Sequence, residues 1–304
     1  MRLGESLRKE FGSKLYKLPL DIGCTCPNRD GKAGTGGCIF CSAAGSGDFA
    51  EKFTGRQEEL GRAKARLSGK IDMKTSRYIA YFQSFSNTYG QVSRLEPLFS
   101  AALNDPQILA LDIATRPDCL DPDILEMLYR LGKRAPLYVE LGLQTIHPAT
   151  ARFINRGYGL PVYDKAVEAL NSIGARTVTH LLFGLPYISG ENERAGRFEL
   201  TLESREMMLD SVKYVAASQV SGVKFHVLLA LRGTRLGQLY SAGLFPTLSR
   251  EEYVSLIADA LPLLPESTVI HRLLSSAPDS LLLGPLWTRD RISVMNELTR
   301  RCFQ

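Results

Sequence analysis

Short β-rich runs alternate with longer helical patterns along most of the chain, and this alternation limits the possible folds. The runs predicted as strands are YKLPLDIG (16–23), RYIAYF (77–82), ILALDIA (108–114), LYVELGL (137–143), RTVTHLLFG (176–184) and GVKFHVLL (222–229). Predicted helices occupy 92–103, 121–132, 162–174 and 197–217. Such alternation is typical of right-handed βαβ units around one parallel sheet. Because a complete β/α barrel has eight strands, we predict an α/β fold with a partial, open (β/α)6 TIM-like barrel over roughly residues 15–235.

The residues after the predicted barrel have mainly helical patterns. LSREEYVSLIADALPLLP (248–265) is an amphipathic helix pattern, a short TVIHRLL segment follows, and a final helix is predicted near 288–302. We therefore interpret residues 1–235 as the barrel core and 236–304 as a C-terminal helical cap packed on that core.

Composition and patterning favour a cytoplasmic protein. No apolar run has the length of a membrane span, and the charged N-terminal residues lack the apolar centre of a secretion signal. In that compartment, clustered cysteines bind metal more often than they form disulfides. The net charge of +5 permits a nucleic-acid partner without requiring one.

Polar side chains recur on one face of three predicted strands. Opposite the aliphatic positions lie Tyr138, Glu140 and Gln144 in the first strand, His180 in the second, and Lys224 and His226 in the third. A single such residue is usually a hydrogen-bonded core group. Several on neighbouring strands favour a ligand-binding interior, because a buried polar group without a partner carries a desolvation cost.

The loop CTCPNRDGKAGTGGCIFC (24–41) holds four of the six cysteines and permits two chemistries. One is a closed tetrahedral zinc site made by Cys24, Cys26, Cys38 and Cys41. The other is an iron–sulfur cluster bound by only Cys26, Cys38 and Cys41, which leaves one iron open to a small molecule. The loop follows the first predicted strand, and loops at the carboxyl ends of barrel strands build active sites. This location favours the open cluster.

These features resemble the radical S-adenosylmethionine (SAM) enzymes. More narrowly, CPNRDGKAGTGGCIFC, YFQSFSNTY, IATRPDCL, ELGLQT, INRGY, HLLFGLP, KFHVLLALRGTRL, EEYV, HRLL and GPLW resemble the bacterial YhcC/MnmL (YtqA) family, in the Elongator-catalytic-subunit-like branch. The resemblance runs from about residue 12 to 287. It departs at Cys24, where the family usually has a non-cysteine residue, and this departure supports Cys26 as the first cluster ligand.

The resemblance implies two cofactors, a [4Fe-4S] cluster and SAM, which is cleaved to a 5′-deoxyadenosyl radical. It also implies a set of SAM-binding residues at matching positions, namely Gln83, Asn87, Thr115, Arg116, Glu140, Gln144, His180 and Leu185 in the turn Gly184–Pro186. An electron donor such as flavodoxin or ferredoxin would be a partner.

The resemblance also implies a tRNA substrate, in which the side chain at C5 of the wobble uridine changes from carboxymethylaminomethyl to aminomethyl. Candidate substrate-binding and catalytic residues in the later motifs are Lys224, His226, Arg232, His271 and Arg272. Their cationic character suits carboxylates or phosphates. Alternatively, Lys224 and Arg272 form internal ion pairs. Two other functions remain open: radical SAM chemistry on a small metabolite or cofactor precursor, and a zinc-stabilised RNA-binding protein without catalysis.

Overall fold

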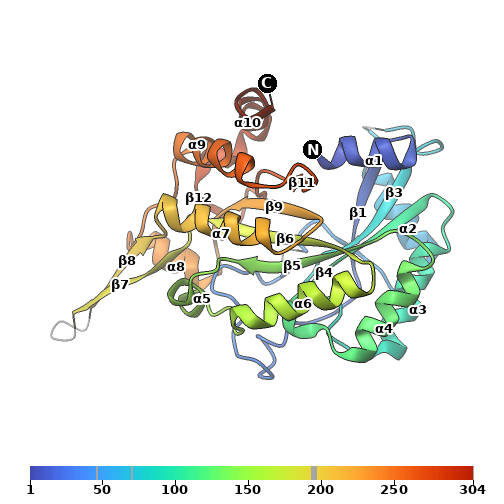
Figure 1. Cartoon of the computed structure of the whole chain (residues 1–304), viewed down its shortest axis with the longest axis horizontal. Helices are drawn as coiled ribbons and strands as arrows, with labels where there is room; N and C mark the ends of the chain where they lie inside the picture. The colour runs from blue at the N-terminus through green and yellow to red at the C-terminus, as the bar shows by residue number, and fades with distance from the viewer. Residues whose placement is uncertain (46, 70, 193–196, 304) are drawn as a thin grey trace.

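A computed structural model describes residues 1–45, 47–69, 71–192 and 197–303, and its centre is one curved parallel sheet (Figure 1). The strand order is β11-β9-β6-β5-β4-β3-β1-β2. The strands are β1 (Leu15–Asp21), β2 (Glu51–Lys52), β3 (Arg77–Phe82), β4 (Ile108–Thr115), β5 (Leu137–Gln144), β6 (Arg176–Phe183), β9 (Gly222–Val227) and β11 (Val269–Arg272). The six predicted strands are confirmed as the middle of this sheet, and β2 and β11 extend it by one strand at each edge.

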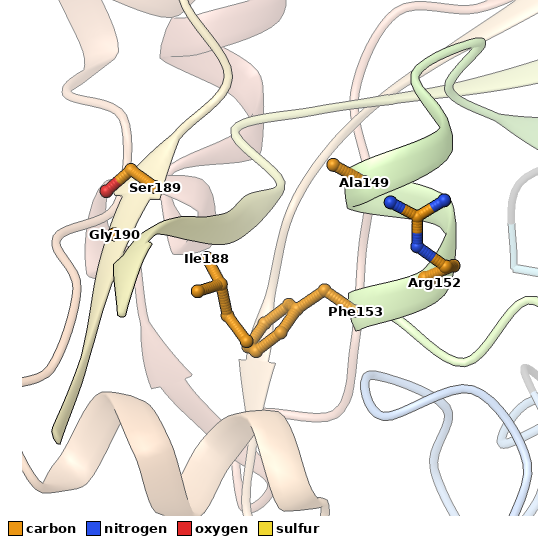
Figure 2. A pocket seen from close by; sticks show the side chains of 6 residues that line it. All are labelled: Ala149, Arg152, Phe153, Ile188, Ser189 and Gly190. Atoms are coloured by element: carbon orange, nitrogen blue, oxygen red, sulfur yellow. The ribbon is translucent and has the colours of Figure 1, made fainter. Parts of the chain in front are cut away.

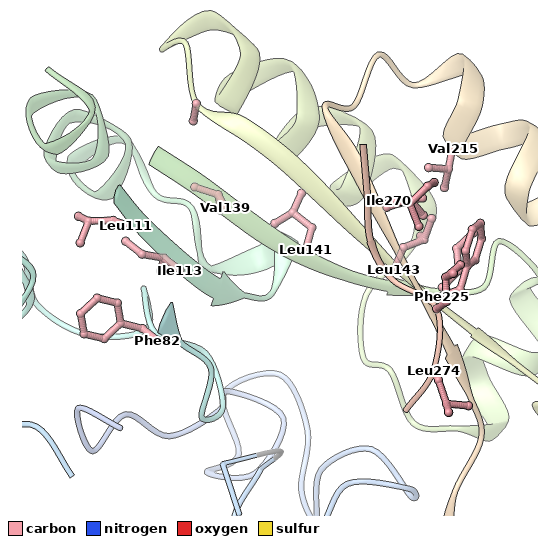
Figure 3. Packing of buried hydrophobic residues seen from close by; sticks show 14 of the residues in the cluster. Phe82, Leu111, Ile113, Val139, Leu141, Leu143, Val215, Phe225, Ile270 and Leu274 are labelled. Carbon is pink, nitrogen blue, oxygen red and sulfur yellow. The ribbon is translucent and has the colours of Figure 1, made fainter. Parts of the chain in front are cut away.

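The outer face of the sheet is covered by helices that follow the strands. These helices are α2 (Gln57–Ala65), α3 (Val92–Leu103), α4 (Pro122–Gly132), α6 (Leu160–Ser172) and α7 (Arg205–Ala217). Aliphatic side chains at alternate strand positions, such as Val139, Leu141 and Leu143, point towards these helices and are fully buried (Figure 3). This period of two is what a strand with one helix-covered face requires.

Helix α1 (Leu3–Phe11) covers the interior at the amino ends of the strands. Leu7 of α1 packs in one buried cluster with interior-facing residues near the strand starts: Leu15, Ile79, Ala110, Tyr138 and Val178. Just before the helix, the backbone N–H of Ile270 donates to the carbonyl of Met1, and Arg2 forms an isolated parallel bridge with Ile270. The N-terminal segment therefore connects the last strand of the sheet, β11, with the first strand of the chain, β1.

The predicted helix at 197–217 is partly wrong. Its first part is strand β8 (Arg197–Leu202), which pairs antiparallel with β7 (Pro186–Asn192), and this hairpin extends away from the sheet (Figure 1). In ELTL (199–202), apolar and polar residues alternate, and Leu200 packs into a buried cluster that also contains Leu185. Helix α7 begins only after Ser204, whose hydroxyl accepts a hydrogen bond from the backbone N–H of Met207, as an N-cap does.

The C-terminal part is largely helical, as predicted, but it also contributes to the sheet. Its helices are α8 (Arg235–Ser241), α9 (Arg250–Ala260) and α10 (Arg291–Phe303), and β10 (Ala230–Leu231) pairs with β12 (Leu282–Gly284). The TVIHRLL segment, which we assigned to the helical cap, contains β11 and pairs in parallel with β9. Within the described ranges, none of the helices combines the length and the apolar character that a bilayer span needs.

Candidate active site

The cysteine loop lies at the carboxyl end of β1 and is held there by two neighbouring segments. The backbone N–H of Ile39 donates to the carbonyl of Ile154 at 3.1 Å, and the N–H of Leu236 donates to the carbonyl of Ile39 at 2.9 Å. The side-chain amide of Asn155, just after α5 (Pro148–Phe153), donates to the carbonyl of Gly37 at 2.9 Å. The loop is thus fixed against the carboxyl rim of the barrel, where its location in the sequence placed it.

A glycine and an arginine set the backbone path of the loop. Gly37 has a φ of +76°, and a Cβ there would lie 2.9 Å from Nε of Arg29, so only glycine fits without strain. The Arg29 guanidinium donates to the carbonyl of Ser42 at 2.6 Å and to that of Cys41 at 3.3 Å. Arg29 therefore places a positive charge and a structural tie beside the last cysteine of the loop.

Three of the four loop thiols influence one another electrostatically. Burial raises the pKa of Cys38 to about 12, and the neighbouring Cys41 and Cys26 add to the effect. Burial also raises the pKa of Cys41. The positive charge of Arg29 opposes this shift, and the neighbouring Cys26 adds to it. Buried thiols with raised pKa values need a bound cation or metal before they become thiolates. Cys26, Cys38 and Cys41, the expected ligands, thus lie within electrostatic range of one another.

Cys24 faces a different set of neighbours. Its sulfur donates weakly to the carbonyl of Asn87 at 3.9 Å and accepts from the Arg94 guanidinium at 3.6 Å. Burial raises the pKa of Cys24, and the charges that act on it are those of Arg94 and Asp21. These contacts distinguish Cys24 from the other three thiols.

Six of the residues that we expected to bind SAM lie on the same carboxyl rim as the loop. Gln83 and Asn87 follow β3, Thr115 and Arg116 lie at the end of β4, Gln144 ends β5, and Leu185 follows β6. Arg116 is engaged within the protein, because it forms two hydrogen bonds with Asp118 at 2.7 and 2.8 Å and donates to the carbonyl of Arg156 at 2.8 Å. The Thr115 hydroxyl lies 2.6 Å from that of Thr88.

Several buried polar atoms near this rim have no hydrogen-bond partner among the described residues. They include Oδ1 of Asn28, Oγ of Ser84, Oγ of Ser86 and Oδ1 of Asn87. Asn87 is fully buried, and its amide nitrogen is used, because it donates to the carbonyls of Phe82 and Ala114 at 2.9 Å each. Buried polar atoms normally have partners, so the unused acceptors indicate where a bound ligand supplies donors.

The other two expected SAM-binding residues, Glu140 and His180, lie deeper, in a polar layer across the barrel interior. Glu140 is fully buried at the centre of this layer and accepts hydrogen bonds from Lys17, Tyr81 and Lys224. His180 Nε2 lies 2.9 Å from the same carboxylate. Lys224 thus forms the internal ion pair that we considered as its alternative role.

Asp112 completes this layer as a second buried carboxylate. Lys17 forms salt bridges with both Asp112 and Glu140. Burial and the nearby Glu140 raise the pKa of Asp112 to about 7, whereas burial lowers the pKa of Lys224 to about 7 despite Glu140. Burial also opposes the ionisation of Glu140, but Lys17 and Lys224 outweigh it and hold the pKa of Glu140 well below its usual value. The layer contains two acids and two lysines, and their charges balance.

Strand register places the remaining interior candidates. Arg272 of β11 is level with Lys224 of β9, and Lys224 is level with His180 of β6. His226 lies one step closer to the rim on β9, with its ring centroid 5.0 Å from that of His180. His180, His226 and Arg272 are each only partly buried. The structure therefore brings these three side chains together on the interior face.

Of the last two candidate residues, Arg232 is exposed and His271 adjoins the interior layer. Arg232 is exposed in the turn after β10, on the outside of this layer. His271 occupies a register irregularity in β11 and packs its ring edge against Tyr138, with 5.6 Å between ring centroids. The ligand atoms of Asp112, Glu140 and His271 lie within 4.8 Å of one another, but Lys17 and Lys224 together already balance the two carboxylates.

A hollow of about 480 Å³ lies outside the barrel, between α5 and the β7 strand of the hairpin. Figure 2 shows Phe153 of α5 and Ile188 of β7 pointing towards one another across it, with Arg152 on the far side of α5. A second hollow, of about 410 Å³, lies between the start of α9 and Arg205 and Arg301. None of the predicted site residues lines either hollow.

Sequence reasoning missed three members of the interior layer: Lys17, Tyr81 and Asp112. Each faces the interior from a strand that we predicted, and Asp112 is a lone charge inside an otherwise apolar strand, ILALDIAT. Alternation along β1, β3 and β4 would have placed all three on the interior face. The same test that identified Glu140 could therefore have identified them.

Three histidines of the barrel interior make folding stability dependent on pH. Burial lowers the pKa of His180, His226 and His271, the last two well below the usual 6.5. As the pH falls below 6.5, the unfolded chain takes up protons that the folded chain does not, so the folded state loses stability. We expect the free energy of unfolding to fall by up to about 1.4 kcal/mol per pH unit for each histidine.

Urea unfolding of the wild type and of the His226→Gln variant between pH 7 and pH 5 would measure this effect. The variant removes one titrating group, and its stability should therefore fall less steeply with acidification than that of the wild type. Parallel curves for the two proteins would contradict the assignment.

Comparison with known proteins agrees with this geometry. Residues 26–198 match the family model of the radical SAM superfamily, and residues 220–303 match that of the radical SAM C-terminal domain. YtqA of Bacillus subtilis is 39% identical over 299 residues, which cover 98% of this chain and 88% of that protein. YhcC of Escherichia coli K12 is 31% identical over 298 residues, covering 98% and 90%.

More distant relatives extend the comparison. Elongator complex protein 3 of Schizosaccharomyces pombe is 28% identical over 204 residues, which cover 66% of this chain but only 35% of that protein. The solved structure of the archaeal Methanocaldococcus infernus Elp3 superposes with a TM-score of 0.65 at 17% identity, covering 95% of this chain and 64% of that one, and this likeness shows the fold. Since the superfamily match spans more than half of the chain, and the relatives above 30% identity cover nearly all of it, this protein is a radical SAM enzyme of the family of YtqA and YhcC, related to Elongator complex protein 3.

Proposed function

We propose that this radical SAM enzyme binds a [4Fe-4S] cluster through Cys26, Cys38 and Cys41 and modifies the C5 side chain of the wobble uridine in tRNA. The observation that carries the cluster assignment is the grouping of three thiols on the carboxyl rim while the fourth, Cys24, is held by Arg94. When bound, the cluster supplies the electron that cleaves SAM to a 5′-deoxyadenosyl radical.

The spacing of the thiols supports this cluster over the zinc alternative. In a closed tetrahedral zinc site, Zn–S bonds of about 2.3 Å bring the sulfurs within about 4 Å of one another. Among the described residues, the cysteine sulfurs do not form a set of three within 4.8 Å of one another. The described cysteines therefore lack the compact sulfur set of a closed zinc site.

The protein's own residues would orient SAM at the rim and keep water from the interior. Oδ1 of Asn87 is a buried acceptor without a partner, so it suits the amino group of the methionine moiety. Gln83, Thr115, Arg116, Gln144 and Leu185 border the same position, and His180 and Glu140 lie beneath it. The buried cluster that contains Ile39, Leu182, Leu185 and Leu228 would shield the inner side of the loop from solvent.

Kinship with Elongator complex protein 3 and the resemblance to the YhcC/MnmL family support tRNA as the substrate. We propose the conversion of a carboxymethylaminomethyl group to aminomethyl, with a cytoplasmic donor such as flavodoxin or ferredoxin supplying the electron. A single-stranded anticodon loop can turn its base out of the stack, as recognition inside a barrel requires. A small metabolite as substrate, and a zinc-stabilised RNA-binding protein, are the alternatives that the experiment below separates.

Mass spectrometry of tRNA nucleosides from a deletion strain tests the substrate. We expect the carboxymethylaminomethyl wobble uridine to accumulate at the expense of the aminomethyl form, and the wild-type gene to restore the balance. Unchanged wobble uridines in the deletion strain would remove tRNA as the substrate.

Anaerobic purification tests the cofactor independently of the substrate. We expect brown protein that contains iron and cleaves SAM when reduced. Colourless protein containing zinc would support the RNA-binding alternative, and active, iron-containing protein without any tRNA phenotype would support a small-molecule substrate.

A further inference from the structure

Arg272 is the one cation of the interior layer that lacks a counter-charge in the described part of the chain. Lys17 and Lys224 balance Asp112 and Glu140, and transfer of a proton between Lys224 and Asp112 leaves that balance unchanged. Arg272 lies level with Lys224, and its charge adds to the effect of burial in lowering the pKa of His180 and of His226. It forms no hydrogen bond or ion pair with any described residue. The interior therefore has one uncompensated positive charge.

One hydrogen-bonding group beside Arg272 is available to a ligand. The Nε2 atom of His226 is buried and has no partner among the described residues. His226 lies one step closer to the carboxyl rim than Lys224, and Arg272 itself is only partly buried. A group that enters from the rim would meet His226 and Arg272 before it reached the closed layer around Glu140.

The geometry points to Arg272 as the binding residue for a carboxylate of the substrate, with Nε2–H of neutral His226 as a second donor. This inference rests on the proposed function, because it assigns the part of the barrel that the substrate occupies. A planar guanidinium matches a carboxylate with two parallel hydrogen bonds. Lys224, which sequence analysis also suggested for an acidic group, is already paired with Glu140.

Charge balance favours a carboxylate over a phosphate monoester. One uncompensated positive charge is matched by the single negative charge of a carboxylate, whereas a doubly charged phosphate would leave an excess negative charge next to Glu140 and Asp112. Charge in a low-dielectric interior is costly unless it is paired. The same reasoning predicts that an amide analogue of the substrate, which lacks the charge, binds poorly.

Saturation-transfer NMR with small probes tests the subsite without the full substrate. The protein is the anaerobically reconstituted full chain with SAM, and the probes are acetate and methyl phosphate. We expect acetate to bind the wild type, to lose its signal in Arg272→Gln, and to keep part of it in Arg272→Lys. The matched control is Arg134→Gln, an exposed arginine after α4, which should behave as the wild type. Circular dichroism and thermal unfolding verify that each variant is folded.

Equal acetate signals in the wild type and Arg272→Gln would overturn the inference, and so would preferential binding of methyl phosphate. With carboxymethylaminomethyl tRNA as substrate, Arg272→Gln should raise KM about 10- to 100-fold, whereas the control Arg134→Gln should leave KM near the wild-type value. If tRNA is not a substrate at all, the proposed function fails, but the acetate experiment still decides the role of Arg272.

Discussion

Replacing Cys41 with alanine is expected to abolish the cluster and to reduce SAM cleavage by about 1,000-fold or more, to background. The cofactor carries the difficult chemistry, and the three thiolates that hold it act as a unit, so two of them cannot do the work of three. Iron content, visible absorbance and 5′-deoxyadenosine production after anaerobic reconstitution measure the loss.

The matched control for this experiment is Cys24→Ala. Because Cys24 contacts Arg94 and Asn87 instead of the other thiols, its loss should cost about 1 kcal/mol of stability and leave iron binding and cleavage near the wild-type level. If Cys24→Ala binds no iron while Cys26→Ala stays active, the first cluster ligand is Cys24.

Glu140→Gln is expected to lower the free energy of unfolding by about 3–5 kcal/mol. The carboxylate pairs with Lys17 and Lys224 and lies against His180, and its side chain has no exposed surface. A neutral amide of the same shape removes the negative charge while both lysines stay in the interior, so their desolvation is no longer offset. Urea unfolding of the metal-free protein measures the change without any contribution from cofactors.

Glu126→Gln provides the surface counterpart of that substitution. Glu126 also forms a salt bridge, with Arg130 one turn away on α4, but its side chain is 72% exposed. Water replaces such an interaction at little cost, so we expect a change within about 0.5 kcal/mol. Similar small effects at both positions would mean that the interior layer does not stabilise the fold through its charges.

Strand patterns predicted the sheet well because each strand has one face covered by helices. In β5, aliphatic residues at every second position identified the strand and its outer face, and Glu140 marked the inner one. Residues 199–202 were predicted as helix because this short alternating segment directly precedes a long helix, and four residues are too few to distinguish the two patterns. Edge strand β11 was missed because four residues carry too little periodicity to be told from a loop.

Pairings inside the barrel could not be predicted from the residue types alone. Lys224 and Arg272 are both cations on late strands, yet one is neutralised by Glu140 and the other is not. The difference arises from the register between β5, β6, β9 and β11, which brings together residues 84 positions apart in the case of Lys224 and Glu140. The candidate ligands in the cysteine loop were easier to predict, because they lie close together in the chain.

The pairing of Met1 and Arg2 with Ile270 has a consequence for how the protein is made. Met1 and Arg2 find their partner in β11 only after all the strands between them and Ile270 have been synthesised. Until then, α1 has no complete barrel end to cover, and the apolar side of that helix stays without its final packing. N-terminal domains usually fold while the rest of the chain is still being synthesised. Here the closing contact joins two segments that flank nearly all strands of the sheet, so this end of the barrel closes only after β11 has been synthesised.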